Sequence, residues 1–178
     1  VGQVQTDRVV DLLADLERRG RRGRAEDHID LFTALTGPVP GFVAWFAATL
    51  AEHARGKCTL IAHVGSAATR DAVKLAELAS DQGYDALSAV PPYYYRHSFE
   101  AIRDYYTAIA SAGNLPLTIY NIPVLSGADL STDKLLELLD IPNVEGIKFT
   151  AQDLFQFGQL RKKCPEKAFY FGTDEMFL

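Results

Sequence analysis

From about residue 56 onward, short apolar runs alternate with stretches of helical periodicity, and this alternation limits the possible folds most strongly. The apolar runs begin at intervals of roughly 25 to 30 residues, the length of one strand followed by one helix. They are continuously apolar, which is typical of parallel strands buried on both faces. The predicted strands are Thr59–Val64, Asp85–Val90, Leu117–Tyr120, Val144–Phe149 and Ala168–Phe171.

Amphipathic helices are predicted between these strands, at 69–83, 98–112, 131–139 and 152–163. Thr69, Ser98 and Ser131 are expected to cap three of them, because a hydroxyl can accept a hydrogen bond from a first-turn amide. Gly83 is expected to end the first helix. Repeats of this length predict an α/β fold, a (β/α)8 TIM barrel present here as a partial barrel of about five to six βα units. A doubly wound open sheet is the alternative.

The N-terminal part of the chain fits this pattern less well. Residues 1–20 predict a helix, and 21–41 form an atypical segment rich in arginine, glycine and proline, with only a weak apolar run at 28–36. The basic run at 18–24 favours a solvated loop over a nucleic-acid site, because no aromatic residues are interleaved to stack on bases. We expect one partial-barrel domain over 1–178, in which 56–178 carries the βα units.

Composition excludes several classes of function. The chain has 178 residues, of which 48% are hydrophobic, enough for one sizeable core. Its net charge of −5 argues against a protein that binds nucleic acid through its overall charge. Cys58 and Cys164 lie far apart without metal-site spacing, which favours reduced thiols in a cytoplasmic protein. No apolar run approaches the roughly 20 residues that span a membrane, and no phosphate-binding or dinucleotide fingerprint is present.

Two residues at predicted strand ends suggest a chemistry. Lys148 lies near the end of one buried strand, where an ammonium loses much of its hydration. Burial favours the neutral amine, which can attack a carbonyl carbon. Tyr120 ends the preceding strand, and its phenol could transfer the proton that such a reaction requires. Because the C-terminal ends of barrel strands meet at one face, the pair predicts a Schiff-base enzyme.

Each candidate residue also has an ordinary structural explanation. A lysine at a strand end often extends to solvent, and consecutive tyrosines such as Tyr93–Tyr95 commonly pack within loops. Asp174 and Glu175 are equally typical of the first turn of a helix. His63 is expected to be a hydrogen-bonded imidazole in or near the core. Only the combination, in one order and at βα spacing, favours catalysis.

Five segments carry a more specific signal. They are Ile61-Ala62-His63-Val64-Gly65, Ser88-Ala89-Val90-x-Pro92-x-Tyr94-Tyr95, Tyr120-Asn121-Ile122-Pro123-x-Leu125-Ser126-Gly127, Gly146-Ile147-Lys148-x-Thr150 and Gly172-x-Asp174-Glu175. Over roughly two-thirds of the chain, they resemble the dihydrodipicolinate synthase/N-acetylneuraminate lyase family of pyruvate-dependent class I aldolases, and within it the N-acetylneuraminate lyase branch. By this resemblance the chain is incomplete at both ends.

The resemblance implies roles for particular residues. Lys148 would be the Schiff-base lysine and Tyr120 the acid/base tyrosine. Tyr94 matches a tyrosine that reaches into a neighbouring subunit's site, which implies a homo-oligomer, usually a tetramer. Four further positions would hold the hydroxylated chain of a sugar acid: Thr150, Gly172, Asp174 and Glu175. No metal or external cofactor is expected, because the lysine itself supplies the electrophile, and neither nucleic acid nor membrane is an expected partner.

Two features favour the branch within the family: a missing arginine, and the carboxylates of Asp174 and Glu175, which suit the hydroxyl groups of a neutral substrate chain. Dihydrodipicolinate synthases carry an arginine shortly after the Tyr-Asn-x-Pro motif, whereas residues 124–127 here contain none. The implied reaction is cleavage of N-acetylneuraminate to pyruvate and N-acetylmannosamine. Another pyruvate-dependent aldolase for keto-deoxy sugar acids and a catalytically inactive truncated remnant are the alternatives.

The N-terminal departure from the family motivates the remnant alternative. Neither the family's first strand nor its Gly-Ser/Thr-Thr-Gly-Glu-like carboxylate-binding loop is found, and Thr36-Gly37 matches that loop poorly. Residues 21–41 resemble out-of-frame translation of GC-rich DNA. Resequencing the locus tests this hypothesis, and an intact frame would remove it.

Overall fold

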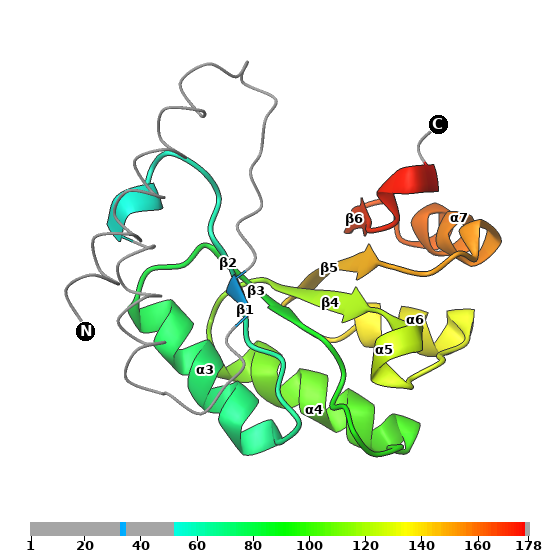
Figure 1. Cartoon of the computed structure of the whole chain (residues 1–178), viewed down its shortest axis with the longest axis horizontal. Coiled ribbons are helices and arrows are strands. Elements are labelled where there is room, and N and C mark those ends of the chain that lie inside the picture. Colours follow the sequence, from blue (N-terminus) through cyan, green and yellow to red (C-terminus); the bar gives the residue numbers. More distant parts are fainter. Residues whose placement is uncertain (1–32, 35–51, 177–178) are drawn as a thin grey trace, which may run out of the picture. The chain divides into compact units, whose positions relative to one another are not determined.

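The computed structural model describes the backbone of residues 33–34 and residues 52–176 (Figure 1). The chain divides into two compact units, Val1–Asp30 and Leu31–Leu178, and all described residues belong to the second. The helix predicted at 1–20 therefore lies outside the described residues, as does most of the atypical segment 21–41. The expectation of one domain over 1–178 stays a prediction.

Six parallel strands form one sheet in the order of the chain, from β1 to β6. They are β1 (Thr33–Ala34), β2 (Ile61–His63), β3 (Ala86–Ala89), β4 (Leu117–Asn121), β5 (Val144–Phe149) and β6 (Ala168–Phe171). A doubly wound sheet reverses its strand order at a switch point, whereas a barrel does not. The partial (β/α)8 barrel is therefore confirmed and the open doubly wound sheet is wrong. The two-residue strand β1 was not predicted.

Helices follow the strands, as βα repetition predicts. They are α3 (Thr69–Asp81), α4 (Phe99–Ala112), α5 (Pro123–Ser126), α6 (Thr132–Leu139) and α7 (Leu154–Lys163), and a 3-10 turn η1 (Asp174–Met176) follows β6. The Ser98 and Ser131 hydroxyls accept hydrogen bonds from Ala101 N and Lys134 N, so both predicted caps are confirmed. The predicted Thr69 cap is wrong, because α3 begins at Thr69 itself and Ala68 occupies the cap position.

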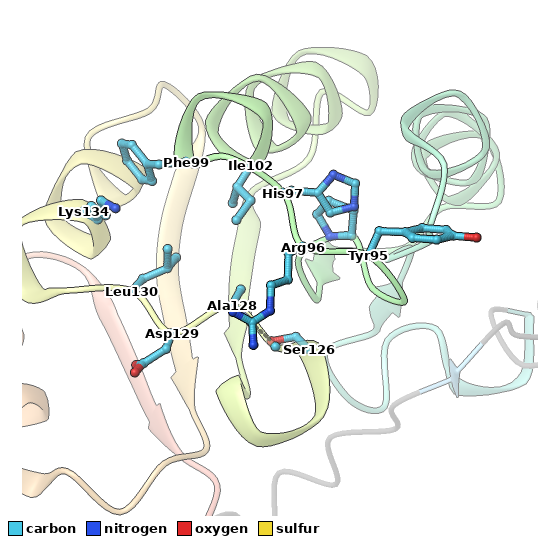
Figure 2. A pocket seen from close by; sticks show the side chains of 12 residues that line it. Tyr95, Arg96, His97, Phe99, Ile102, Ser126, Ala128, Asp129, Leu130 and Lys134 are labelled. Atoms are coloured by element: carbon cyan, nitrogen blue, oxygen red, sulfur yellow. Dashed lines mark hydrogen bonds between the residues drawn. The ribbon is translucent and has the colours of Figure 1, made fainter.

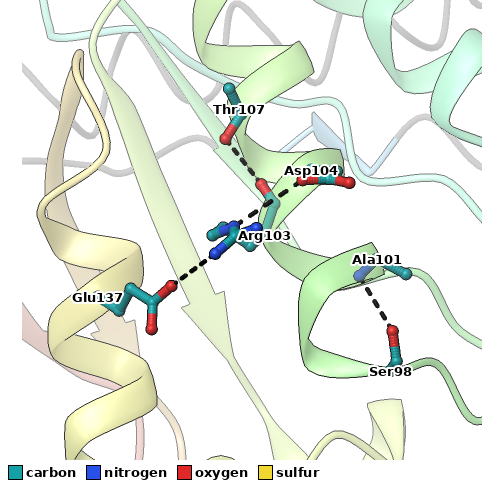
Figure 3. A network of polar contacts seen from close by, with 6 residues as sticks. All are labelled: Ser98, Ala101, Arg103, Asp104, Thr107 and Glu137. Carbon is teal, nitrogen blue, oxygen red and sulfur yellow. Dashed lines mark hydrogen bonds and ion pairs between the residues drawn. The ribbon is translucent and has the colours of Figure 1, made fainter.

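A polar network links α4 to α6 on the outside of the sheet (Figure 3). The Arg103 guanidinium donates to Glu137 Oε1 at 2.9 Å, and Thr107 Oγ1 donates to the Arg103 carbonyl at 2.8 Å. These side chains are solvent-exposed, and exposed ion pairs contribute little to stability. The helices are held chiefly by their apolar faces, which bury residues such as Ile109 and Leu138 completely.

Alternation along the strands separates an apolar face from a polar one. Leu87 faces the helices, since a Cβ placed on Gly113 at the end of α4 would lie 2.8 Å from Leu87 Cδ1. Its neighbour Ser88 must then face the barrel interior. Ser88 pairs with Thr118 on β4, so Thr118 lies on the same face. Tyr120, two residues further along β4, lies on that face as well. The interior of the sheet near its C-terminal edge is therefore polar.

Two buried tyrosines of α4 tie this helix to the strand ends near the site. Tyr106 donates to the Ala89 carbonyl at 3.1 Å. The Tyr105 hydroxyl accepts from Ser66 N at 2.9 Å and donates to the Ser66 carbonyl at 3.1 Å. Burial raises the pKa of Tyr105 to about 12 and the pKa of Tyr106 well above its usual value, so both stay protonated donors. They fix the ends of β2 and β3.

Candidate active site

Lys148 and Tyr120 come together at the C-terminal ends of β5 and β4. The two residues are register partners in the parallel pairing of these strands, so both side chains leave the sheet on the same face. Lys148 Nζ lies 4.3 Å from the centroid of the Tyr120 ring, and both side chains are half-buried. Lys148 is thus not a strand-end lysine extended into solvent. The predicted proximity of amine and phenol is present.

Thr150 and Gly172 complete the interior around the amine. Thr150 N donates to the Asn121 carbonyl at 2.8 Å, and Gly172 N donates to the Phe149 carbonyl at 2.9 Å, which fixes both residues at neighbouring strand ends. A Cβ at Gly172 would overlap Thr150 Oγ1 and lie 3.2 Å from Lys148 Cε. A larger residue here would therefore force the Thr150 or the Lys148 side chain to shift. Thr150 Oγ1 is buried, and none of the described residues bonds to it.

His63, at the end of β2, faces the same cluster. Its ring meets the Tyr120 ring edge-on, with centroids 6.0 Å apart. Burial, and secondarily the charge of Lys148, lowers the pKa of His63 to about 4, so the imidazole is neutral at physiological pH. The expectation of a near-core position is confirmed. The expectation of a hydrogen-bonded imidazole is wrong for Nδ1, which is buried without a bonding partner within the described part of the chain.

Three other predicted site residues lie outside this interior cluster. Asp174 and Glu175 are exposed on η1, the turn that begins two residues after Gly172. Tyr94 is 85% exposed, adopts a left-handed backbone conformation (φ 78°), and makes its ring contact with Tyr93. Within this chain the structure does not bring Tyr94 to Lys148. Sequence reasoning missed the inward-facing Ser88 because one serine within an apolar run carries no signal without the strand register.

A hollow of about 150 Å³ lies between the loop after β3 and the turn after α5 (Figure 2). Arg96 extends toward Ser126 and Ala128, whereas Tyr95 points away from them. Lys134 closes another side of the hollow and lies over the Phe99 ring, 5.3 Å from its centroid. Lys148, Tyr120 and His63 do not line this hollow, so it is separate from the interior cluster.

The described residues contain no group of three or more histidine, cysteine, aspartate or glutamate side chains placed to hold a metal ion. Cys58 and Cys164 are both unpaired, half-buried thiols. Among the helices within the described ranges, none is both long and apolar enough to cross a membrane.

Comparison with known proteins identifies the family. The model of the dihydrodipicolinate synthetase family matches residues 45–178. An N-acetylneuraminate lyase of Salmonella paratyphi B is 48% identical over 129 residues, which are 72% of this chain and 43% of that protein. The structure of CdNal from Clostridium difficile in complex with mannosamine has 40% identity and a TM-score of 0.73, covering 75% of this chain and 46% of that one.

A dihydrodipicolinate synthase from Acinetobacter baumannii, solved with pyruvate, is structurally close as well. It has 36% identity and a TM-score of 0.71, again over 75% of this chain and 46% of that chain. The chain belongs to the dihydrodipicolinate synthetase family. It is similar to N-acetylneuraminate lyases and spans less than half the length of the Salmonella relative.

Proposed function

We propose that the chain is part of a Schiff-base aldolase that cleaves N-acetylneuraminate to pyruvate and N-acetylmannosamine. The observation that carries the proposal is the placement of Lys148 Nζ 4.3 Å from the Tyr120 ring centroid, inside a barrel of this family. An amine and a phenol in this arrangement supply the nucleophile and the proton carrier of a class I aldolase.

Lys148 forms the covalent bond in the proposed reaction. Its amine, once deprotonated, adds to the C2 ketone of the open-chain substrate, and the carbinolamine loses water to give an iminium. When the C3–C4 bond breaks, its electron pair moves onto the iminium and leaves a neutral enamine. Protonation at C3 and addition of water then release pyruvate and restore the lysine. No external cofactor takes part in these steps.

Tyr120 moves the proton that makes bond cleavage possible. The C4 hydroxyl must lose its proton as C4 becomes the aldehyde carbon of N-acetylmannosamine. Tyr120 accepts that proton as it passes its own phenolic proton to the substrate carboxylate. The register pairing with Lys148 places the Tyr120 phenol beside the amine. C4 lies two bonds from the iminium carbon C2, so the same phenol is near the C4 hydroxyl. We assign Tyr120 as the acid/base residue.

The substrate's hydroxylated chain is proposed to lie along the β5–β6 side of the site. Thr150 Oγ1 is a buried hydrogen-bonding group without a partner among the described residues, and it lies close against Gly172. Asp174 and Glu175 follow on η1 and can accept hydrogen bonds from sugar hydroxyls. The lack of an arginine at 124–127 argues against an acidic aldehyde substrate, as dihydrodipicolinate synthases use.

The active assembly is proposed to be a cytoplasmic homo-oligomer, a tetramer as is usual in the family. Tyr94 is exposed, as are Tyr95 beside it and Val124 and Leu125 on α5, and a subunit interface would remove such apolar side chains from water. A Tyr94 that reaches into a neighbouring subunit's site explains why it lies away from Lys148 here.

Borohydride trapping tests the proposal directly. The protein is incubated with pyruvate and sodium borohydride and digested with trypsin. The mass of the peptide that carries Lys148 is then measured by mass spectrometry. We expect a mass gain that corresponds to reduced pyruvate on Lys148, and release of N-acetylmannosamine from N-acetylneuraminate. Adduct formation with faster cleavage of shorter keto-deoxy acids would favour the alternative aldolase, and no adduct would overturn the proposal.

A further inference from the structure

Two buried polar atoms near the site are left without a function. Among the described residues, His63 Nδ1, Ser88 Oγ and Thr150 Oγ1 are buried and have no hydrogen-bond partner. Thr150 lies beside Lys148, and a hydroxyl of the proposed substrate would supply its hydrogen-bond partner. His63 Nδ1 and Ser88 Oγ are not, and an unsatisfied buried polar atom is destabilising. Their persistence in the barrel interior therefore requires an explanation.

The two atoms belong to adjacent positions on one face of the sheet. His63 and Ser88 are register partners on β2 and β3, so their side chains project in the same direction. Ser88 is fully buried and faces the interior, as Leu87 faces the helices. The His63 ring reaches across β3 to meet Tyr120 on β4 edge-on.

We propose that His63 Nδ1 and Ser88 Oγ form a polar subsite for one buried water molecule, and that the imidazole anchored there is a positioning residue for Tyr120. A buried water generally needs two to four polar partners, and one shared molecule satisfies both atoms at once. The anchored ring then holds the edge of the phenol in place while Tyr120 transfers a proton. His63 acts through Tyr120 and forms no bond with substrate.

The charge state of His63 suits this role. Its neighbours from the packed strands are Ser88 on β3, Tyr120 on β4 and Lys148, whose charge is felt at the imidazole, on β5. Burial and that charge lower the pKa of His63 to about 4, so the ring stays neutral near neutral pH. A neutral imidazole has one donor and one acceptor nitrogen, and water can match either at Nδ1. No second cation then competes with the iminium on Lys148.

The kinetic test rests on the proposed function and separates two steps of it. Pyruvate trapping on Lys148 does not need Tyr120, whereas C–C cleavage does. We expect His63→Ala to keep the pyruvate adduct and the KM but to lower kcat for cleavage about tenfold, with a smaller loss for Ser88→Ala. Because Ser88 acts only through the anchored ring, the double variant should be no slower than His63→Ala. Exposed His53→Ala is the matched control and should behave as wild type.

Several outcomes would overturn the inference. Wild-type cleavage by His63→Ala would do so, as would additive losses in the double variant, or an equal loss of the adduct and of cleavage. Ser88→Ala carries the same test if His63→Ala does not fold by circular dichroism. A crystal structure of the protein tests the subsite without turnover: electron density for one water within hydrogen-bonding distance of both atoms supports it, and its absence overturns it. Failure of the proposed function is recognised separately, by a wild-type protein that forms no adduct.

Discussion

Polar side chains at the two ends of the parallel sheet differ in whether their hydrogen bonds are satisfied. At the N-terminal end, Lys167 Nζ donates to the Val144 carbonyl at 2.6 Å, and Asn143 Nδ2 donates to the carbonyls of Ala110 and Leu115. At the same end Asp85 accepts from Leu60 N at 2.8 Å. Each of these side chains completes the hydrogen bonding of the backbone around it.

At the C-terminal end, buried polar atoms of His63, Ser88 and Thr150 have no partner among the described residues. Lys148 lies over an aromatic ring there, whereas Lys167 at the other end bonds a carbonyl. In barrels of this type the C-terminal face carries function and the N-terminal face carries stability. Two partly buried lysines of one sheet are therefore distinguished by the groups that surround them.

Exchanging the two lysines for methionine should separate function from stability most sharply. Lys148→Met removes the proposed nucleophile, and we expect cleavage activity to fall on the order of 10⁴-fold or more, with no pyruvate adduct. Lys167→Met should keep the adduct but lower the free energy of unfolding by about 1–3 kcal/mol, because the Val144 carbonyl loses its donor. Kinetics, borohydride trapping and urea unfolding measure the three effects. Equal adduct yields in both variants would contradict the comparison.

Tyr120→Phe, at the C-terminal end of the sheet, should separate Schiff-base formation from C–C bond cleavage. The ring below Lys148 remains and only the hydroxyl is removed, so Schiff-base formation should persist. Cleavage should fall by about 10²–10⁴-fold, the usual contribution of a general acid or base. Trapping with pyruvate and turnover of N-acetylneuraminate give the two values. A parallel loss of both would show that the phenol acts in binding and not in proton transfer.

Low pH should destabilise the folded protein through His63, at the C-terminal end of the sheet. The pKa of His63 is about 4 in the folded chain and 6.5 when unperturbed, so between these values the unfolded state binds more protons. Stability is therefore lost as pH falls from 6.5 toward 4, by about 3 kcal/mol from this residue. His63→Phe keeps a ring and cannot titrate, so its urea midpoint should fall less over the same range. Identical pH profiles would show that the imidazole is not held neutral.

Filling the space beside the amine should give the smallest effect. In Gly172→Ala the new methyl would overlap Thr150 Oγ1 and press on Lys148 Cε, and we expect roughly tenfold less adduct under matched conditions. Gly158→Ala in α7 is the matched control, since a Cβ there meets nothing within 4 Å. It should leave the adduct unchanged and add about 0.5–1 kcal/mol to stability. A wild-type adduct yield from Gly172→Ala would show that this corner is not tightly packed.

Much of the fold follows from the sequence because its signals are local. The bounds of β5 and β6 agree with the predicted ones, since both are continuous apolar runs, and the Ser98 and Ser131 caps depend only on the residues that follow them. The short helix α5 was missed because four residues carry no helical periodicity. The Thr69 cap failed because a hydroxyl one position too late lies inside the first turn.

The candidate site was predicted in part, for a comparable reason. The proximity of Lys148 and Tyr120 was predicted because each lies near the C-terminal end of a strand, and the ends of parallel strands converge. His63 was taken for an ordinary near-core residue, since its contact with Tyr120 depends on register across the intervening strand β3. The exposed position and left-handed backbone of Tyr94 could not be predicted either. Neither depends on a contact with Lys148 in the same chain.

The pairing of Tyr120 with Lys148 in the backbone ladder constrains how this protein can diversify. The separation of amine and phenol is set by the spacing between hydrogen-bonded strands, which no surface substitution alters, and a slip of one residue would turn one group away from the other. The backbone pairing of β4 with β5 therefore holds the two proposed reactive groups together. The turn from Gly172 to Glu175 lies outside that ladder, so under the proposed function substitutions there would change how the substrate is held while the amine and the phenol keep their places.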